Sequence, residues 1–301
     1  MSVLYPFRPA TGWPRAGLAG AAASAAPPHQ AGFMPADALI RAAAARARFV
    51  RPADIDGCAR PPDVQAVEGA LRRHVLAEDY PCVAARSAAN RGRMQVAVHG
   101  RLGDADSARR ACEDLQRYVA RMGQDPDRDA PMTWVSAYMA EPGMDEAGFE
   151  RALWRHLQLM HEHDARQHGW SPGHSADPAD ADFAFCIGGE PFFVIGLHPA
   201  ASRLARRAPW PMLVFNLHRQ FDALRRAGRY ERMKAVIRQR DTALQGSPNP
   251  MLDDFGTRSE ARQYAGRAVG DDWTCPFHAA GAAHPRQAQP ATAIPSNHKA
   301  T

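Results

Sequence analysis

The sequence contains almost no lysine and no long apolar run. Of its 37 basic side chains only Lys234 and Lys299 are lysines, in a chain of 301 residues with a net charge of +5. No segment approaches the roughly 18 consecutive apolar residues typical of a membrane helix. No basic stretch is interleaved with aromatic residues as in proteins that bind single strands. We therefore expect neither a membrane nor a nucleic-acid partner, and we attribute the excess of arginine to a bias toward Arg, Ala and Pro.

Cysteines are few and have no metal-binding spacing. The five of them lie at Cys58, Cys82, Cys112, Cys186 and Cys275. An odd, dispersed number argues against a disulfide scaffold and for a reducing compartment. Residues 16–26, the segment most like a signal peptide, consist mainly of Ala and Gly and lack an apolar h-region. We expect a cytoplasmic protein.

Composition separates two tails from a central folded segment. Residues 1–60 form an Ala/Pro-rich leader, expected to be mostly disordered at its start, and residues 279–301 form a disordered tail. Large apolar side chains are too scarce there to offset the entropy of ordering the chain. Residues 61–278 are predicted to form one domain.

The hydrophobic periodicity of the central segment alternates between helix and strand. It predicts helices over residues 63–77, 107–122, 145–168, 219–226 and 229–244. Strands are predicted over residues 94–99, 133–139, 183–187, 192–197 and 212–215. Gly188 and Gly189 predict a tight hairpin. This order favours an α+β fold, a single domain with a mixed, largely antiparallel sheet packed by helices.

Two short apolar runs, residues 192–197 and 212–215, each lead to a histidine. His198 follows the first run and precedes Pro199, which stiffens the turn. An imidazole at the edge of an apolar layer suits a ligand of a metal or of haem iron. His218 is a second ligand candidate, or a group that contacts bound dioxygen. For both, the alternative is a structural histidine that is hydrogen-bonded to neighbouring groups.

Polar side chains follow His198 closely. Arg203 and Arg207 could pair with the two propionates of a haem, although a solvated basic turn is the alternative. Ser202 could donate a hydrogen bond to oxygen bound at the iron. Farther along, Glu260 and Asp254 are carboxylates that suit a cationic, planar substrate group, with an internal network of arginines and carboxylates as the alternative.

The predicted helix over residues 145–168 is rich in histidine. His161 and His163 point in different directions on a helix, so one metal ion could not easily take both. We interpret this side mainly as solvated, with His161 or Asp164 as lesser candidates for lining a site.

Two cysteines stand next to prolines. Cys82 lies in YPC and Cys275 in CPF. A rigid turn can present the sulfur, and a thiolate on haem iron favours cleavage of the O–O bond. A buried, inert thiol is the default alternative.

These Cys-Pro sites and the block between them resemble the YqcI/YcgG family, which is also described by its FPC and CPF motifs. The first motif reads YPC here and the second is intact in WTCPF. The resemblance runs over about residues 71–277 and includes GLHPAASRLARR, LVFNLHRQFDALRRAG, IRQRD, GSPNPMLDDFG and SEARQYAGR.

The resemblance implies a catalytic domain over residues 61–278 that is a haem-dependent oxygenase. Members of the family include N-hydroxylases of guanidino compounds such as arginine, in natural-product biosynthesis. The implied cofactor is haem b, bound noncovalently because no C-x-x-C-H is present. The alternatives are a haem-binding sensor or carrier without turnover, and an oxygenase with a nonhaem metal.

Site roles follow from this hypothesis. His198 is the preferred axial ligand, with His218 and Cys275 as rivals, and Cys82 is kept among the cofactor-binding candidates. Because no G-x-G-x-x-G follows a strand, two electrons must come from an outside donor such as a ferredoxin or a flavin reductase. Oligomeric state stays open, with a homodimer as one option.

Overall fold

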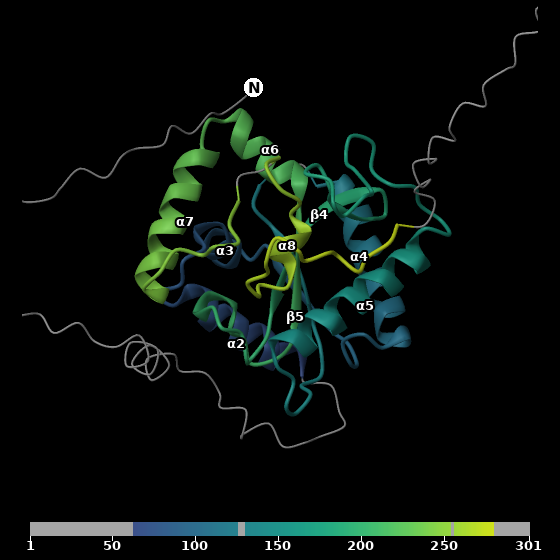
Figure 1. Cartoon of the computed structure of the whole chain (residues 1–301), viewed down its shortest axis with the longest axis horizontal. Coiled ribbons are helices and arrows are strands. Elements are labelled where there is room, and N and C mark those ends of the chain that lie inside the picture. Colours follow the sequence, from purple (N-terminus) through teal and green to yellow (C-terminus); the bar gives the residue numbers. More distant parts are fainter. Residues whose placement is uncertain (1–62, 126–129, 254–255, 280–301) are drawn as a thin grey trace, which may run out of the picture. The chain divides into compact units, whose positions relative to one another are not determined.

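A five-stranded mixed sheet organises the described part of the protein (Figure 1). The structure is a computed structural model that describes residues 63–125, 130–253 and 256–279. The strand order is β1-β2-β5-β4-β3, with β1 and β2 parallel and the other neighbouring pairs antiparallel. The predicted leader and all but the first residue of the predicted tail lie outside the described residues.

All five predicted strands are confirmed. They are β1 (Met94–Val98), β2 (Thr133–Ala137), β3 (Phe185–Ile187), β4 (Glu190–Leu197) and β5 (Met212–Leu217). Gly188 and Gly189 form the tight turn between β3 and β4, with φ values of 62° and 74°. Two consecutive positive φ values are what such a hairpin requires, so the predicted hairpin is confirmed as well.

The five predicted helices are also confirmed. They are α2 (Val64–Leu76), α4 (Ala105–Gly123), α5 (Glu146–Asp164), α6 (His218–Arg226) and α7 (Tyr230–Gln245). Three short elements were not predicted: α3 (Val83–Asn90), the 3-10 turn η2 (Leu204–Arg206) and α8 (Ala261–Tyr264). α3 is rich in alanine and lacks a stripe of large apolar residues. The Cys82 sulfur caps it by accepting the amide hydrogen of Ala85 at 3.5 Å.

One face of the sheet is covered by α4, α5 and α8. Its core contains Phe149, Leu153, Phe185, Phe215 and Tyr264, all of them fully buried. The packing is close enough that a Cβ on Gly196 of β4 would lie 2.7 Å from a ring carbon of Phe149. This glycine therefore allows β4 and α5 to approach each other.

The opposite face is covered less completely. α2 and α3 pack on it through a smaller cluster that includes Val67, Leu71 and Val75. α7 also lies on this side of the sheet, away from α4 and α5 (Figure 1). Asp241 is the buried residue of α7, and Met233 and Ile237 on its inward side are only half-buried.

The predicted fold class is confirmed: seven α-helices and the mixed sheet form an α+β single domain within the described ranges. None of the helices described there combines the length and the apolar character needed to cross a bilayer.

Candidate functional site

A cavity of about 300 Å³ lies between the sheet and the helices α2, α3, α6 and α7. Ile195, Leu197 and Val214 form part of its sheet wall, and Met233 and Ile237 of α7 face them. The cavity exists because α7 stands away from the sheet instead of packing on it. Its size is at the lower end of the roughly 300–1,000 Å³ range typical of small-molecule sites.

Charged and polar side chains also line this cavity. Its cationic side chains are Arg203, Arg206, Arg225, Lys234, Arg238 and Arg258. Its carboxylates are Asp241, Asp253 and Glu260, and His218 and Cys82 add an imidazole and a thiol. Such a set of convergent polar groups in an apolar hollow is typical of a ligand site.

His218 is the histidine of this cavity, and its ring is held in place. It begins α6 directly after β5 and is 3% exposed. Its Nε2–H donates to the carboxylate of Glu260 at 3.1 Å. The phenol of Tyr264 donates to the same carboxylate. His174 lies edge-on to the imidazole, with ring centroids 5.1 Å apart.

These hydrogen bonds hold the His218 ring so that Nε2 faces the Glu260 carboxylate. The phenol stays protonated, because burial and the nearby Glu260 raise the pKa of Tyr264 well above its usual value. A histidine oriented by a carboxylate is the usual arrangement of a metal-binding imidazole.

His198 lies elsewhere. Its ring stacks on Phe149 of α5, with centroids 4.3 Å apart, and it is not among the residues that line the cavity. Neither ring nitrogen has a hydrogen-bond partner among the described residues, and burial lowers the pKa of His198 to about 4.

Strand geometry explains why His198 and His218 are apart. Side chains alternate between the faces of a strand, so His198 falls on the face opposite that of Leu197, which lines the cavity. β4 and β5 are antiparallel, with Leu197 paired to Met212. The end of β4 is therefore next to the start of β5, whereas His218 follows the other end of β5.

The two cysteines of the Cys-Pro motifs are also on opposite faces. Cys82 lines the cavity, and burial raises the pKa of its thiol. Cys275 is half-buried against the core of the α5 face, where burial raises its pKa to about 12. Burial therefore favours the protonated thiol at both positions.

The predicted propionate-binding arginines are both occupied within the protein. Arg203 lines the cavity but forms a buried ion pair with Asp241. Arg207 is outside the cavity lining, and its Nε donates to the carbonyl of Ala201 at 2.8 Å. The cationic side chains of α6 and α7 that line the cavity are Arg225, Lys234 and Arg238.

The remaining predicted residues have three different outcomes. Ser202 lies outside the cavity lining, where its hydroxyl donates to Glu146 at 2.8 Å. Glu260 lines the cavity. Asp254 lies outside the described residues, while its neighbour Asp253 lines the cavity.

Tyr264 was not predicted from the sequence to be a site residue. Glu260 and Tyr264 stand four positions apart in SEARQY, which is the spacing of neighbours on a helix. This spacing was the available signal. It could not reveal the partner His218, which is 42 positions away from Glu260.

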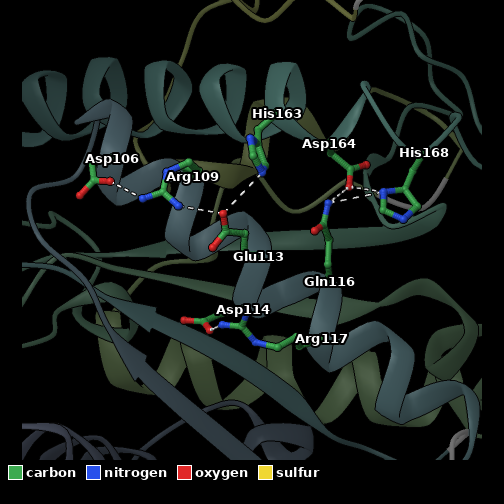
Figure 2. Close-up of polar contacts among 9 residues, drawn as sticks. All are labelled: Asp106, Arg109, Glu113, Asp114, Gln116, Arg117, His163, Asp164 and His168. Atoms are coloured by element: carbon green, nitrogen blue, oxygen red, sulfur yellow. Dashed lines mark hydrogen bonds and ion pairs between the residues drawn. The ribbon is translucent and has the colours of Figure 1, made fainter.

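The histidine-rich helix α5 contributes a second polar cluster, which is structural. Figure 2 shows Asp164 facing Gln116 and His168. The Asp164 carboxylate accepts from Gln116 at 2.7 Å, from His168 at 2.9 Å and from the amide of Gly188 at 3.0 Å. These bonds tie α5 to α4 and to the hairpin between β3 and β4.

The interpretation of this side of α5 as mainly solvated is wrong for His161 and Asp164, which are 4% and 3% exposed. His161 packs edge-on against Trp170 and Phe277. Neither His161 nor Asp164 lines the cavity. In the part of the chain that the structure describes, no group of three or more His, Cys, Asp or Glu residues is arranged to hold a metal ion.

Fold and cavity together define an α+β protein whose mixed sheet is fully packed on one face and lines an apolar, histidine-bearing cavity on the other. The sequence profile of the YqcI/YcgG family matches residues 71–278. The chain belongs to this family, and the family assignment made from the sequence is confirmed.

Two curated relatives come from Bacillus subtilis (strain 168). The chain is 27% identical over 232 residues to "Uncharacterized protein YcgG", with 72% of this chain and 88% of the relative covered. It is 26% identical over 206 residues to "Uncharacterized protein YqcI", with 66% of this chain and 80% of the relative covered. No solved structure significantly matches the chain.

Proposed function

We propose that this protein is a cytoplasmic, haem-dependent oxygenase that hydroxylates a nitrogen of a guanidino or amino compound such as arginine. The observation that carries the proposal is a buried imidazole, His218, oriented by a carboxylate inside an apolar cavity. The sequence resemblance supplies the reaction class, and the cavity supplies residues suited to it.

The residues of the cavity fit a noncovalently bound haem. Apolar side chains from the sheet and from α7 face each other across the cavity, as a porphyrin ring requires. Arg225, Lys234 and Arg238 line it as well, and such cations suit the two propionates. In our hypothesis these three replace Arg207, which lies outside the cavity lining, and Arg203, whose ion pair with Asp241 is buried. Arg225 and Lys234 are also paired, but with the more exposed carboxylates of Asp222 and Glu231.

His218 is the ligand we favour. His198 and Cys275 lie on the other face of the sheet, which leaves Cys82 as the rival inside the cavity. A thiol must lose its proton to bind a metal, and burial raises the pKa of Cys82. An imidazole binds a metal in its neutral form and does not have to ionise first.

When bound, haem supplies the iron at which dioxygen or peroxide is activated. The protein's own residues have three roles beside it. Glu260 and Tyr264 hold the ring of His218, the apolar walls exclude water, and Asp253 orients the cationic end of the substrate. We assign that last role to Asp253 because Glu260 is already bonded to His218 and Tyr264.

The test is turnover by the purified protein supplied with haem, arginine and a reducing system. We expect a hydroxyguanidine product, detected by mass spectrometry, that requires all three additions. Asp253→Asn should raise KM for arginine and leave the haem spectrum unchanged. The matched control is Asp272→Asn, because Asp272 is exposed and does not line the cavity. A haem-loaded protein without product would point to a sensor or carrier.

A further inference from the structure

Positive charge is concentrated on two helices. α6, α7 and the turn between them, residues 218–245, contain eight basic and three acidic residues, a net charge of +5. Residues 63–279 together contain 28 basic and 29 acidic residues, a net charge of −1. The remainder of this segment therefore carries a net charge of −6, and the charge is strongly segregated.

The basic helices are the same ones that cover the cavity. Met233 and Ile237 of α7 line it from the inside, while Arg226, Arg229 and Arg232 are exposed on the outside. The basic surface is thus separated from the cavity by a single helix, whose diameter is about 10 Å.

Two of the exposed arginines here, Arg229 and Arg232, differ from those of α4. On α4, Arg109 pairs with Asp106 and Glu113 within the same helix. The side chains of Arg229 and Arg232 have no ion-pair partner among the described residues. An uncompensated surface charge of this kind is available to an acidic partner.

We infer that this basic surface of α6 and α7, centred on Arg226, Arg229 and Arg232, is the docking site of an acidic iron–sulfur electron-transfer protein. The inference rests on the proposed function. Hydroxylation of one N–H bond by dioxygen forms one N–OH group and one water and consumes two electrons and two protons. The donor's cluster supplies these electrons one at a time, and a docking site one helix away from the cavity keeps the transfer path short.

Other occupants fit the surface less well. The chain's own ends cannot neutralise it, since residues 1–62 contain seven basic and three acidic residues and residues 280–301 contain two basic and no acidic ones. Nucleic acid is disfavoured because no basic stretch of the sequence is interleaved with aromatic residues. Val236, a large apolar side chain that is 36% exposed on the same helix, suits a protein partner, whose interfaces combine apolar and charged groups.

Charge reversal tests the inference. The variant is Arg226→Glu/Arg229→Glu/Arg232→Glu, and the matched control is Arg151→Glu/Arg155→Glu/Arg166→Glu, which reverses three exposed arginines on and just after α5. The probe is an acidic plant-type [2Fe–2S] ferredoxin, and its Kd is measured by fluorescence anisotropy at low and high salt. Haem content is recorded on the same samples from the absorption spectrum, and circular dichroism confirms folding.

We expect the α6–α7 variant to bind ferredoxin roughly tenfold more weakly or worse at low salt, and the control to bind like the wild type. High salt should remove most of the difference, because it screens exposed charges. Dithionite should reduce the haem of all three proteins equally. Equal ferredoxin binding by variant and control overturns the inference. Tighter binding of a DNA duplex than of ferredoxin at this surface also overturns it.

The two hypotheses fail separately. A wild type that binds no haem but binds ferredoxin through these arginines contradicts the proposed function and supports the surface. If the wild type binds haem and charge reversal leaves ferredoxin binding unchanged, the proposed function is supported and the proposed docking site is contradicted.

Discussion

The two faces of the sheet are built differently. The face toward α4, α5 and α8 is filled with aromatic and aliphatic side chains, many of them fully buried, and Gly196 is needed to let Phe149 approach. The face toward α2, α3 and α7 has a smaller apolar cluster and a cavity of about 300 Å³. The first face therefore holds the fold together, and the second leaves room for a ligand.

Polar contacts replace apolar packing where α7 is attached. Asp241 pairs with Arg203, Arg240 donates to the carbonyl of Tyr80, and Gln245 accepts the amide hydrogen of Leu204. All three anchors lie in the last six residues of α7. The helix can be held firmly there while its earlier part stands away from the sheet.

The largest stability effect that we expect comes from Asp241→Ala. It leaves the buried guanidinium of Arg203 without its carboxylate, which should lower the free energy of unfolding by roughly 3–5 kcal/mol. Urea denaturation measures this loss. The control Arg203→Met/Asp241→Leu removes both charges at similar volume and should recover most of it. A small loss in Asp241→Ala would mean that apolar packing, not this pair, holds α7.

Added volume should distinguish the two faces directly. Ala111→Leu adds a large side chain to α4 at a position that is 0% exposed, and overpacking of this kind costs about 1–3 kcal/mol. The matched change Ala85→Leu on α3 points into the cavity and should cost less than about 1 kcal/mol. Thermal or urea unfolding of both variants gives the comparison. Equal losses would contradict a difference in packing between the faces.

Acid should act on the packed face through its buried histidines. Burial lowers the pKa of His156 from 6.5 to about 3. Between these two pH values, His156 binds a proton in the unfolded chain but not in the folded protein. Stability should fall as the pH decreases from 6.5 toward 3, by roughly 2 kcal/mol at pH 5 for this residue.

His156→Gln tests this pH dependence. Glutamine can still accept from Gly103 and donate to Tyr138, the two partners of the imidazole, but it does not titrate. The slope of unfolding free energy against pH should decrease between pH 6.5 and 5. An unchanged slope would assign the acid sensitivity to other groups, such as His99, whose pKa burial lowers to about 4.

Tyr264 links the two faces and gives the smallest effect. Its ring stacks on Trp154 in the packed core, with centroids 5.6 Å apart, and its hydroxyl donates to Glu260 in the cavity. Tyr264→Phe should cost about 1 kcal/mol and weaken haem binding, because Glu260 then holds His218 less firmly. The control is Tyr118→Phe, which removes a buried hydroxyl that has no partner among the described residues. Equal effects of the two changes on stability and haem binding would show that Tyr264 is not part of the site.

Local pattern was sufficient to predict most of the fold. Periods of two and of about 3.6 residues located the five strands and the five longer helices, and two glycines located a hairpin. α3 was not predicted, because its alanines do not form a recognisable stripe of large apolar residues. α8, only four residues long, is too short for a periodicity to appear.

The site depends on contacts that the sequence does not specify locally. His198 and His218 each follow an apolar strand, and from the sequence His198 was the preferred ligand with His218 as a rival. The antiparallel pairing of β4 with β5 and the alternation of side chains separate them, and both features depend on which strands become neighbours. The ion pair of Arg203 with Asp241, 38 positions apart, was likewise beyond local reasoning.

The most direct test of the account is the absorption spectrum of the purified protein titrated with haem, repeated for His218→Ala and His198→Ala. We predict an intense Soret band for the wild type that saturates with one haem per chain, is lost in His218→Ala and is retained in a folded His198→Ala. A folded wild type that stays colourless with excess haem would contradict the account. So would a band that survives in His218→Ala and disappears in a folded His198→Ala.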